Sequence, residues 1–285
     1  MTERVTHVSA AGVSLAVHAW GRGPSVLALH GFTGTGGGFA PLAARWSQRY
    51  RVVAPDLVGH GASEAPSVAA PYAMEACVEQ LSALIDAKAL GRVHLFGYSM
   101  GGRTALALAA RAPEKVASLA LLGASPGLAG EDERAARRAS DEALAARIEA
   151  DGVAAFVESW ESLPLFASQT TRLDGDTRAA LRRDRLSQRA SGLAGSLRGM
   201  GTGAQPALHA ALGTLSVPCW IAAGAEDTKF VAIADQMAGQ IPDAQRVDVP
   251  AAGHAAHWEN ANFLAASLSE FWSRVEARSE ASHDG

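Results

Sequence analysis

A serine at position 99 stands where a turn of the chain exposes a nucleophile. Residues 97–101 read Gly-Tyr-Ser-Met-Gly, between the apolar run 93–96 and the helix-forming stretch 102–108. This order of strand, sharp turn and helix is typical of a nucleophile elbow, in which small residues two before and two after the serine let strand and helix approach closely. The hydroxyl then lies at a helix N-terminus, where free N–H groups and the helix dipole stabilise developing negative charge. The pattern predicts Ser99 as a catalytic residue.

An elbow serine needs a base and an acid that orients the base, and both follow the serine in the order acid, then histidine. Asp227 comes just after the apolar strand candidate 217–223, and His254 follows the strand candidate 245–249. The active sites of parallel sheets are built at these carboxyl ends of strands. We therefore predict a catalytic triad of Ser99, Asp227 and His254.

Three other residues compete for these roles. His60 and His257 are alternative bases, and Glu226 is the alternative acid. His257 lies where the last helix is expected to begin, so we interpret it as a helix-start or packing residue. Asp227 matches the usual position of the acid in this loop better than Glu226 does.

A glycine-rich loop after the early strand 25–30 indicates an oxyanion hole. The strand ends in His30-Gly31, and a His-Gly pair at this point lets the backbone N–H of Phe32 point toward the elbow. The N–H of Met100 is the expected second donor. A phosphate-binding loop is the alternative, but the segment lacks Gly-Lys-Ser/Thr and a clean dinucleotide fingerprint.

The composition restricts the class of protein. With 285 residues, 48% of them apolar and 19% charged, the chain can form one large domain or a domain with an inserted cap. No apolar run approaches the ~20 residues of a membrane span, and the N-terminus lacks a hydrophobic signal core. Cys77 and Cys219 are predicted to be buried thiols, and no metal-ligand spacing is present. We expect a cytoplasmic protein without metal or cofactor, and the net charge of −4 indicates neither nucleic acid nor a membrane as partner.

Strands and helices alternate around the candidate site. Residues 4–19 are predicted to form a hairpin that turns at 11–12. The expected strands are 25–30, 51–54, 92–96, 116–122, 217–223 and 245–249, and the expected helices are 39–49, 73–89, 100–111, 229–238 and 259–277. Short apolar strands separated by helices predict an α/β fold, with a mostly parallel central sheet and helices on both faces.

The alternation stops between the strand candidates 116–122 and 217–223. Residues 126–206 are helical in pattern, rich in charge and free of strand signals. Because this segment follows the strand after the elbow helix, we expect it to form a lid over the catalytic face. The predicted organisation is a core in two parts (1–125 and 207–278), the helical lid (126–206) and a frayed polar tail (279–285).

Several stretches resemble the 2-succinyl-6-hydroxy-2,4-cyclohexadiene-1-carboxylate synthases, menaquinone-pathway lyases of the α/β-hydrolase superfamily. The resemblance covers about residues 24–265 and is carried by 97–103, 125–128, 133–141, 164–169, 192–206, 224–230 and 252–260. Two departures occur where the family often has Gly-Glu before the acid loop and Glu-Asn-Pro after the histidine. Here these positions read Gly224-Ala225-Glu226 and Glu259-Asn260-Ala261, and neither change removes a group that the chemistry needs.

The resemblance implies elimination of pyruvate from 2-succinyl-5-enolpyruvyl-6-hydroxy-3-cyclohexene-1-carboxylate, an anion with three carboxylates. Ser99, polarised by His254, would take the proton beside the succinyl ketone, while the two backbone amides hold the enolate oxygen. Arginines would hold the carboxylates through bidentate contacts. By position in the family pattern, the substrate-binding residues are Tyr98, Arg103, Arg137, Trp160, Phe166 and Arg185.

Two other functions fit the same fold. A serine esterase or carbon–carbon bond hydrolase would use the triad to attack a carbonyl covalently. A catalytically silent binding protein would have no chemical use for an intact triad, elbow and oxyanion loop. The feature that separates lyase from hydrolase is whether three arginines point at Ser99. We expect the protein to act as a monomer.

Overall fold

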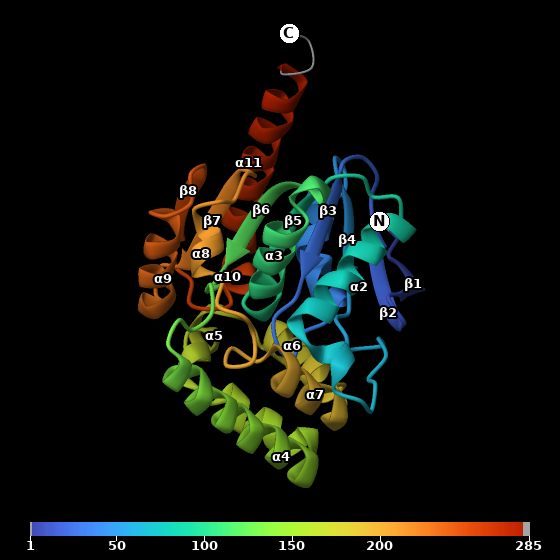
Figure 1. The fold of residues 1–285 in the computed structure, drawn as a ribbon, viewed down its shortest axis with the longest axis vertical. Coiled ribbons are helices and arrows are strands. Elements are labelled where there is room, and N and C mark those ends of the chain that lie inside the picture. Colours follow the sequence, from blue (N-terminus) through green and yellow to red (C-terminus); the bar gives the residue numbers. More distant parts are fainter. Residues whose placement is uncertain (1, 282–285) are drawn as a thin grey trace.

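The computed structural model describes residues 2–281 and has an eight-stranded sheet at its centre (Figure 1). The strands are β1 (Arg4–Ala10), β2 (Val13–Trp20), β3 (Ser25–Leu29), β4 (Arg51–Pro55), β5 (Val93–Tyr98), β6 (Val116–Leu122), β7 (Cys219–Gly224) and β8 (Ala244–Val249). Their order in the sheet is β1-β2-β4-β3-β5-β6-β7-β8. β2 pairs antiparallel with β1 and β4, and all other neighbours are parallel. The predicted mostly parallel α/β sheet is confirmed.

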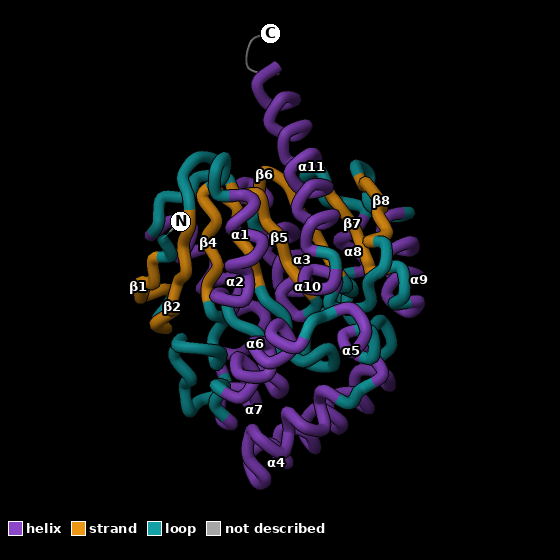
Figure 2. Tube along the Cα trace, turned by 180° about the vertical axis from the view of Figure 1, so that it is seen from behind, coloured by secondary structure: helices purple, strands orange, loops and turns teal. Residues whose placement is uncertain are grey.

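Helices cover both faces of this sheet. The helices are α1 (Ala40–Trp46), α2 (Met74–Ala87), α3 (Met100–Arg111), α4 (Glu131–Glu161), α5 (Gln169–Arg172), α6 (Gly175–Leu186), α7 (Ala190–Met200), α8 (His209–Leu212), α9 (Thr228–Ala238), α10 (Ala256–Glu259) and α11 (Ala261–Ala281). Figure 1 shows α2, α3 and α9 in front of the sheet, and Figure 2 shows α1 and α11 over the opposite face. Within residues 2–281, no helix is both long and apolar enough to cross a membrane.

The two faces carry separate hydrophobic cores, because neighbouring strand residues point to opposite sides. Leu27 and Leu95 belong to the core under α2, α3 and α9, whereas their neighbours Val26 and Phe96 belong to the core under α1 and α11. All four side chains are fully buried. Continuous apolar strands of this kind are expected where a parallel sheet is covered on both sides.

Helices α4–α7 lie between β6 and β7 in the chain and pack beyond the carboxyl ends of the parallel strands (Figure 1). We call residues 126–206 the cap. The cap has a small core of its own, which includes Ile148, Phe156 and Leu193. α4 is broken at Gly152, whose φ of 81° lies in the left-handed region that favours glycine. Because α4–α7 lie beyond the carboxyl ends of the strands, the cap stands over the edge of the sheet where the triad candidates lie.

Several element boundaries differ from the sequence-based predictions. β5 reaches Tyr98, two residues beyond the predicted end, because its ladder to β6 continues through the glycine before Tyr98. The predicted helix 39–49 ends at Trp46 and follows a short 3₁₀ turn. The last helix begins at Ala261, because the Asn260 side chain caps it by accepting from the N–H of Phe263 at 3.3 Å. It continues to Ala281, so the first residues of the predicted frayed tail are helical, and 282–285 lie outside the described residues.

Candidate active site

Ser99 occupies a strained turn between β5 and α3. Its φ of 51° and ψ of −112° place a non-glycine residue at positive φ, which is uncommon and costly. A Cβ at Gly97 would collide with the carbonyl oxygen of Gly101, and a Cβ at Gly101 would collide with that of Leu29. The glycines two before and two after Ser99 are therefore required by close backbone packing, as the elbow pattern predicts.

The three predicted triad residues come together at one end of the sheet. Asp227 follows β7, and His254 follows β8. His254 Nδ1 lies 2.7 Å from Asp227 Oδ2, and His254 Nε2 lies 3.1 Å from Ser99 Oγ. Because an ionised carboxylate only accepts hydrogen bonds, Nδ1 carries the proton and Nε2 faces the serine as an acceptor. The arrangement allows His254 to take the Ser99 proton.

The competing residues do not contact Ser99. Glu226 forms an ion pair with Arg172 at the surface. Burial lowers the pKa of both His60 and His257 to about 3, so both rings are neutral. The ring centroid of His257 lies 4.1 Å from that of Tyr98, which makes His257 a packing residue of α10.

The two predicted oxyanion donors flank the serine. Met100 is the first residue of α3, so its N–H has no acceptor within the helix. Phe32 lies in the loop after β3, where a Cβ added to Gly31 would come 3.5 Å from the Cβ of Ser99. His30 holds this loop, because its Nδ1 donates to the Gly31 carbonyl at 2.8 Å and its Nε2 accepts from a backbone N–H at 2.9 Å. The loop is thus fixed beside the nucleophile.

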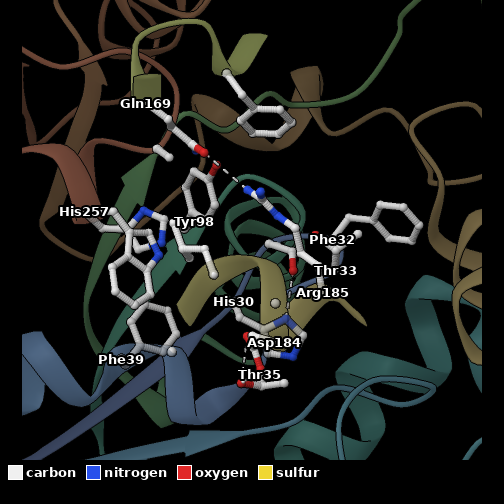
Figure 3. A pocket seen from close by; sticks show the side chains of 17 residues that line it. His30, Phe32, Thr33, Thr35, Phe39, Tyr98, Gln169, Asp184, Arg185 and His257 are labelled. Atoms are coloured by element: carbon white, nitrogen blue, oxygen red, sulfur yellow. Dashed lines mark hydrogen bonds between the residues drawn. The ribbon is translucent and has the colours of Figure 1, made fainter. Parts of the chain in front are cut away.

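Side chains of the cap also hold the oxyanion loop, a role that the sequence analysis did not assign. Gln188 Nε2 donates to the carbonyls of Thr33 and Gly34 at 3.3 and 3.4 Å, and its Oε1 accepts from the N–H of Gly61 at 2.9 Å. Thr35 Oγ1 donates to Asp184 at 3.0 Å (Figure 3). No local sequence signal marks these contacts, because they join residues about 150 positions apart.

A cavity of about 280 Å³ extends from Ser99 and His254 to the cap. Its polar wall contains the cations Arg103, Arg137 and Lys229, and none of its lining residues among the described positions is Asp or Glu. A cavity of this size with a few convergent polar groups is typical of a small-molecule site. The charge of the wall favours an anionic ligand.

Arg103 and Arg137 approach this cavity from α3 and α4. Arg103 donates to the Met200 carbonyl at 2.8 Å and to the side-chain oxygen of Gln205. Burial, and then the charge of Arg137, lower the pKa of Arg103 to about 10, so it remains charged at neutral pH. Arg137 Nε donates to Asp141 at 2.8 Å. The pair provides one positive region on the α3–α4 side of Ser99.

Aromatic rings form the apolar wall. Trp160 lies with its ring centroid 5.5 Å from that of Phe32 and 5.7 Å from that of Phe166. Tyr98 packs against His254 with ring centroids 5.4 Å apart, and burial raises the pKa of its hydroxyl. Tyr98, Trp160 and Phe166, predicted as substrate-binding residues, therefore line the same cavity as Ser99.

Arg185 is placed differently from the sequence-based expectation. It lines a second, smaller cavity of about 60 Å³, which shares Tyr98 and Phe166 with the Ser99 cavity. Figure 3 shows Arg185 in this second cavity with Gln169 and Tyr98. There it donates to Glu161 at 2.9 Å and to Gln169 at 3.4 Å, with its guanidinium carbon 5.3 Å from the Phe166 ring centroid. Only two of the three predicted arginines, Arg103 and Arg137, thus line the Ser99 cavity, and the third is paired with a carboxylate 24 positions earlier in the chain.

The site offers no metal centre within the described residues. Among positions 2–281, no group of three or more His, Cys, Asp or Glu side chains is arranged to hold a metal ion. The two cysteines, Cys77 and Cys219, are buried free thiols.

Comparisons with known proteins agree with this architecture. Residues 24–261 match the family described as alpha/beta hydrolase fold. The chain is 39% identical over 251 residues to a Bacillus subtilis protein provisionally named 2-succinyl-6-hydroxy-2,4-cyclohexadiene-1-carboxylate synthase, covering 88% of this chain and 91% of that one. It is 32% identical over 247 residues to the synthase of that name from Salmonella schwarzengrund, covering 87% and 93%.

Solved structures show the same relationship. The chain superposes on MenH from S. aureus with a TM-score of 0.85 and 32% identity, covering 91% of this chain and 98% of the other. A thermophilic esterase from Thermogutta terrifontis, with malate bound, gives 0.84 at 26% identity, covering 95% and 99%. The fold alone does not separate the two, but the sequence identity does. The chain belongs to the α/β-hydrolase fold family and, within it, to the 2-succinyl-6-hydroxy-2,4-cyclohexadiene-1-carboxylate synthases.

Proposed function

We propose that this enzyme is a lyase that eliminates pyruvate from 2-succinyl-5-enolpyruvyl-6-hydroxy-3-cyclohexene-1-carboxylate. The product is 2-succinyl-6-hydroxy-2,4-cyclohexadiene-1-carboxylate, an intermediate of menaquinone biosynthesis. The observation that carries the proposal is a cavity at Ser99 and His254 whose wall contains three cations and, among the described residues, no Asp or Glu, in a chain 39% identical to a protein named for this reaction. The proposed substrate has three carboxylates, which such a wall suits.

The proposed chemistry is proton abstraction followed by elimination. Ser99 Oγ takes the proton next to the succinyl ketone as His254 Nε2 takes the hydroxyl proton, and Asp227 stabilises the imidazolium that forms. The electron pair moves onto the ketone oxygen, which the N–H groups of Phe32 and Met100 hold as an enolate. When the enolate collapses, the bond to the enolpyruvyl oxygen breaks, and protonation of the departing group gives pyruvate. No acyl-enzyme forms.

The cap supports this reaction by closing the site. Arg137, Trp160 and Phe166 come from the cap, whereas Ser99 and His254 come from the core, so the cavity is complete only when the two parts are together. Exclusion of water strengthens the electrostatic contacts and protects the enolate. We therefore assign residues 126–206 the role of a lid. We also propose that the enzyme is a cytoplasmic monomer.

A serine hydrolase is the second candidate, and the likeness to the esterase structure is the observation that favours it. It would need Ser99 to attack a carbonyl carbon directly, using the same triad. Two of the three arginines expected for the lyase line the cavity, and Lys229 is a third cation in its wall. Neutral esters offer nothing to these three groups.

The first experiment is incubation of the purified protein with the enolpyruvyl precursor. Pyruvate should appear in equal amounts to the precursor consumed, while a set of neutral p-nitrophenyl esters should be turned over with a far lower kcat/KM. Efficient ester hydrolysis without pyruvate release would favour the hydrolase.

A further inference from the structure

Lys229 stands in the wall of the Ser99 cavity and has no role in the mechanism above. It is the second residue of α9, directly after the turn that holds Asp227. Its Nζ lies 5.8 Å from the ring centroid of Phe230, and that ring lies 4.5 Å from the ring of His254. The Phe230 ring therefore lies close to both this cation and His254.

The charge of Lys229 has no carboxylate partner among the described residues, and its ammonium lies over the Phe230 ring. Among the described residues it forms no ion pair, whereas Lys115 pairs with Asp86 and Lys88 donates to Thr6 at 2.7 Å. It also lies in the first turn of a helix, where a cation opposes the helix dipole and a carboxylate is favoured. Neither an ion pair nor helix stability explains a lysine here, and its exposed ammonium can meet an anionic ligand in the cavity that it lines.

The arginines near the cavity do not supply a cation on its His254 side. Arg103 and Arg137 are close enough for the charge of one to lower the pKa of the other, so they form a single positive region. Arg185 is engaged by Glu161 outside the cavity. On the His254 side of the wall, Lys229 is the cation that faces the same space.

We propose that Lys229 binds a carboxylate of the substrate on the His254 side of the cavity, as the counterpart of the Arg103–Arg137 region. This inference rests on the proposed function, since it assigns one anionic group of that substrate. An exposed lysine on a flexible stem provides a mobile point charge, which suits capture of an anion at the cavity mouth rather than stabilisation of the enolate. Its loss is therefore expected to change KM and leave kcat unaltered.

The test compares Lys229→Met, which keeps length and removes charge, with Lys229→Arg and with the distant control Lys88→Met. KM for the precursor should rise about tenfold in Lys229→Met, the scale of one charged contact, with kcat within about twofold of the parent enzyme. Lys229→Arg should restore KM to within about threefold. The dependence of kcat/KM on ionic strength should be weaker in Lys229→Met than in Lys88→Met.

A second readout separates this inference from the proposed reaction. Citrate, a stable tricarboxylate, is titrated against each variant while tryptophan fluorescence is followed, since Trp160 lines the cavity. A dissociation constant about tenfold higher in Lys229→Met than in Lys88→Met supports the inference even if the parent enzyme releases no pyruvate, a result that would contradict only the proposed function. Equal citrate affinity in the two variants, or equal KM values, overturns the assignment of Lys229.

Discussion

The two cavities that share Tyr98 and Phe166 show how neighbours decide what an arginine can do. On the Ser99 side, Arg103 is bound by neutral oxygens, and its full positive charge remains available to a ligand. On the other side, Arg185 is about nine-tenths buried and paired with Glu161, so its charge is already balanced. Three arginines that look equivalent in the sequence are thus not equivalent in the structure. Arg137 is also paired, with Asp141, but it lines the Ser99 cavity, so both the partner and the position of an arginine decide whether a ligand can reach its charge.

The largest expected effect comes from loss of the Ser99 hydroxyl. Ser99→Ala should lower kcat by roughly 10²- to 10⁴-fold, because a positioned base contributes about that factor. Substrate binding should survive, since the cation contacts remain. Pre-steady-state pyruvate release and equilibrium binding measure the two quantities separately. Activity near that of the parent enzyme would remove Ser99 from the mechanism.

Loss of a cation on the Ser99 side should act on binding. Arg137→Ala is expected to raise KM by about ten- to hundredfold, because a charged hydrogen bond contributes about 1.5–3 kcal/mol. The matched control is Arg278→Ala. Arg278 lies on the last helix, and its exposed side chain pairs with Asp243 at 3.0 Å. If the two variants gave the same KM, the carboxylate-binding role of Arg137 would be wrong.

Arg185→Ala provides the direct comparison between the two cavities. Its effect on KM should be smaller than that of Arg137→Ala, since Arg185 faces Glu161 and not the Ser99 cavity. Both changes should also lower stability, because Arg137→Ala leaves the buried Asp141 without its partner, whereas Arg185→Ala leaves Glu161 paired with Arg182 but removes a contact of the Phe166 ring. Steady-state kinetics on both variants test the difference in KM, and thermal unfolding measures the loss of stability in each. A KM effect equal to that of Arg137→Ala would mean that Arg185 leaves Glu161 when substrate binds.

The smallest expected effect is a pH dependence of stability in the second cavity. Burial raises the pKa of Asp184 from its ordinary 3.8 to about 6, so the folded protein retains a proton that the unfolded chain releases. Asp184 should therefore lower the free energy of unfolding as pH rises from about 4 to about 6. Denaturant titrations across this range should show that Asp184→Asn removes this decrease. Asp176→Asn, an exposed change on the same helix, should leave it in place, and an unchanged slope in Asp184→Asn would contradict the assignment.

Features of the fold and the site that depend on local sequence pattern can be predicted from the sequence. The turn at Ser99 is fixed by glycines two residues away on each side, and Asp227 and His254 follow apolar strands whose carboxyl ends meet in any parallel sheet. The fold class and the relative positions of these residues could therefore be predicted from the sequence alone. The strand ends shifted by one or two residues because ladder pairing, rather than composition, determines where a strand stops.

What the sequence did not predict depends on contacts between distant segments. Glu161 engages Arg185, and Gln188 holds the loop of Thr33, without any local pattern that marks either pair. The position of Lys229 was a partial exception, because it lies two residues after Asp227 in a stretch already singled out for the triad. Its neighbourhood was visible in the sequence, but its lack of an ion pair was visible only in the structure.

In the proposed reaction Ser99 moves a proton and does not form an acyl-enzyme. Intact-mass spectrometry of the enzyme, acid-quenched during steady-state turnover of the enolpyruvyl precursor, distinguishes the two possibilities. An unmodified protein mass is expected at every time point while pyruvate accumulates. A substrate-derived acyl mass that builds up on Ser99 during turnover, and disappears as substrate is exhausted, would contradict it.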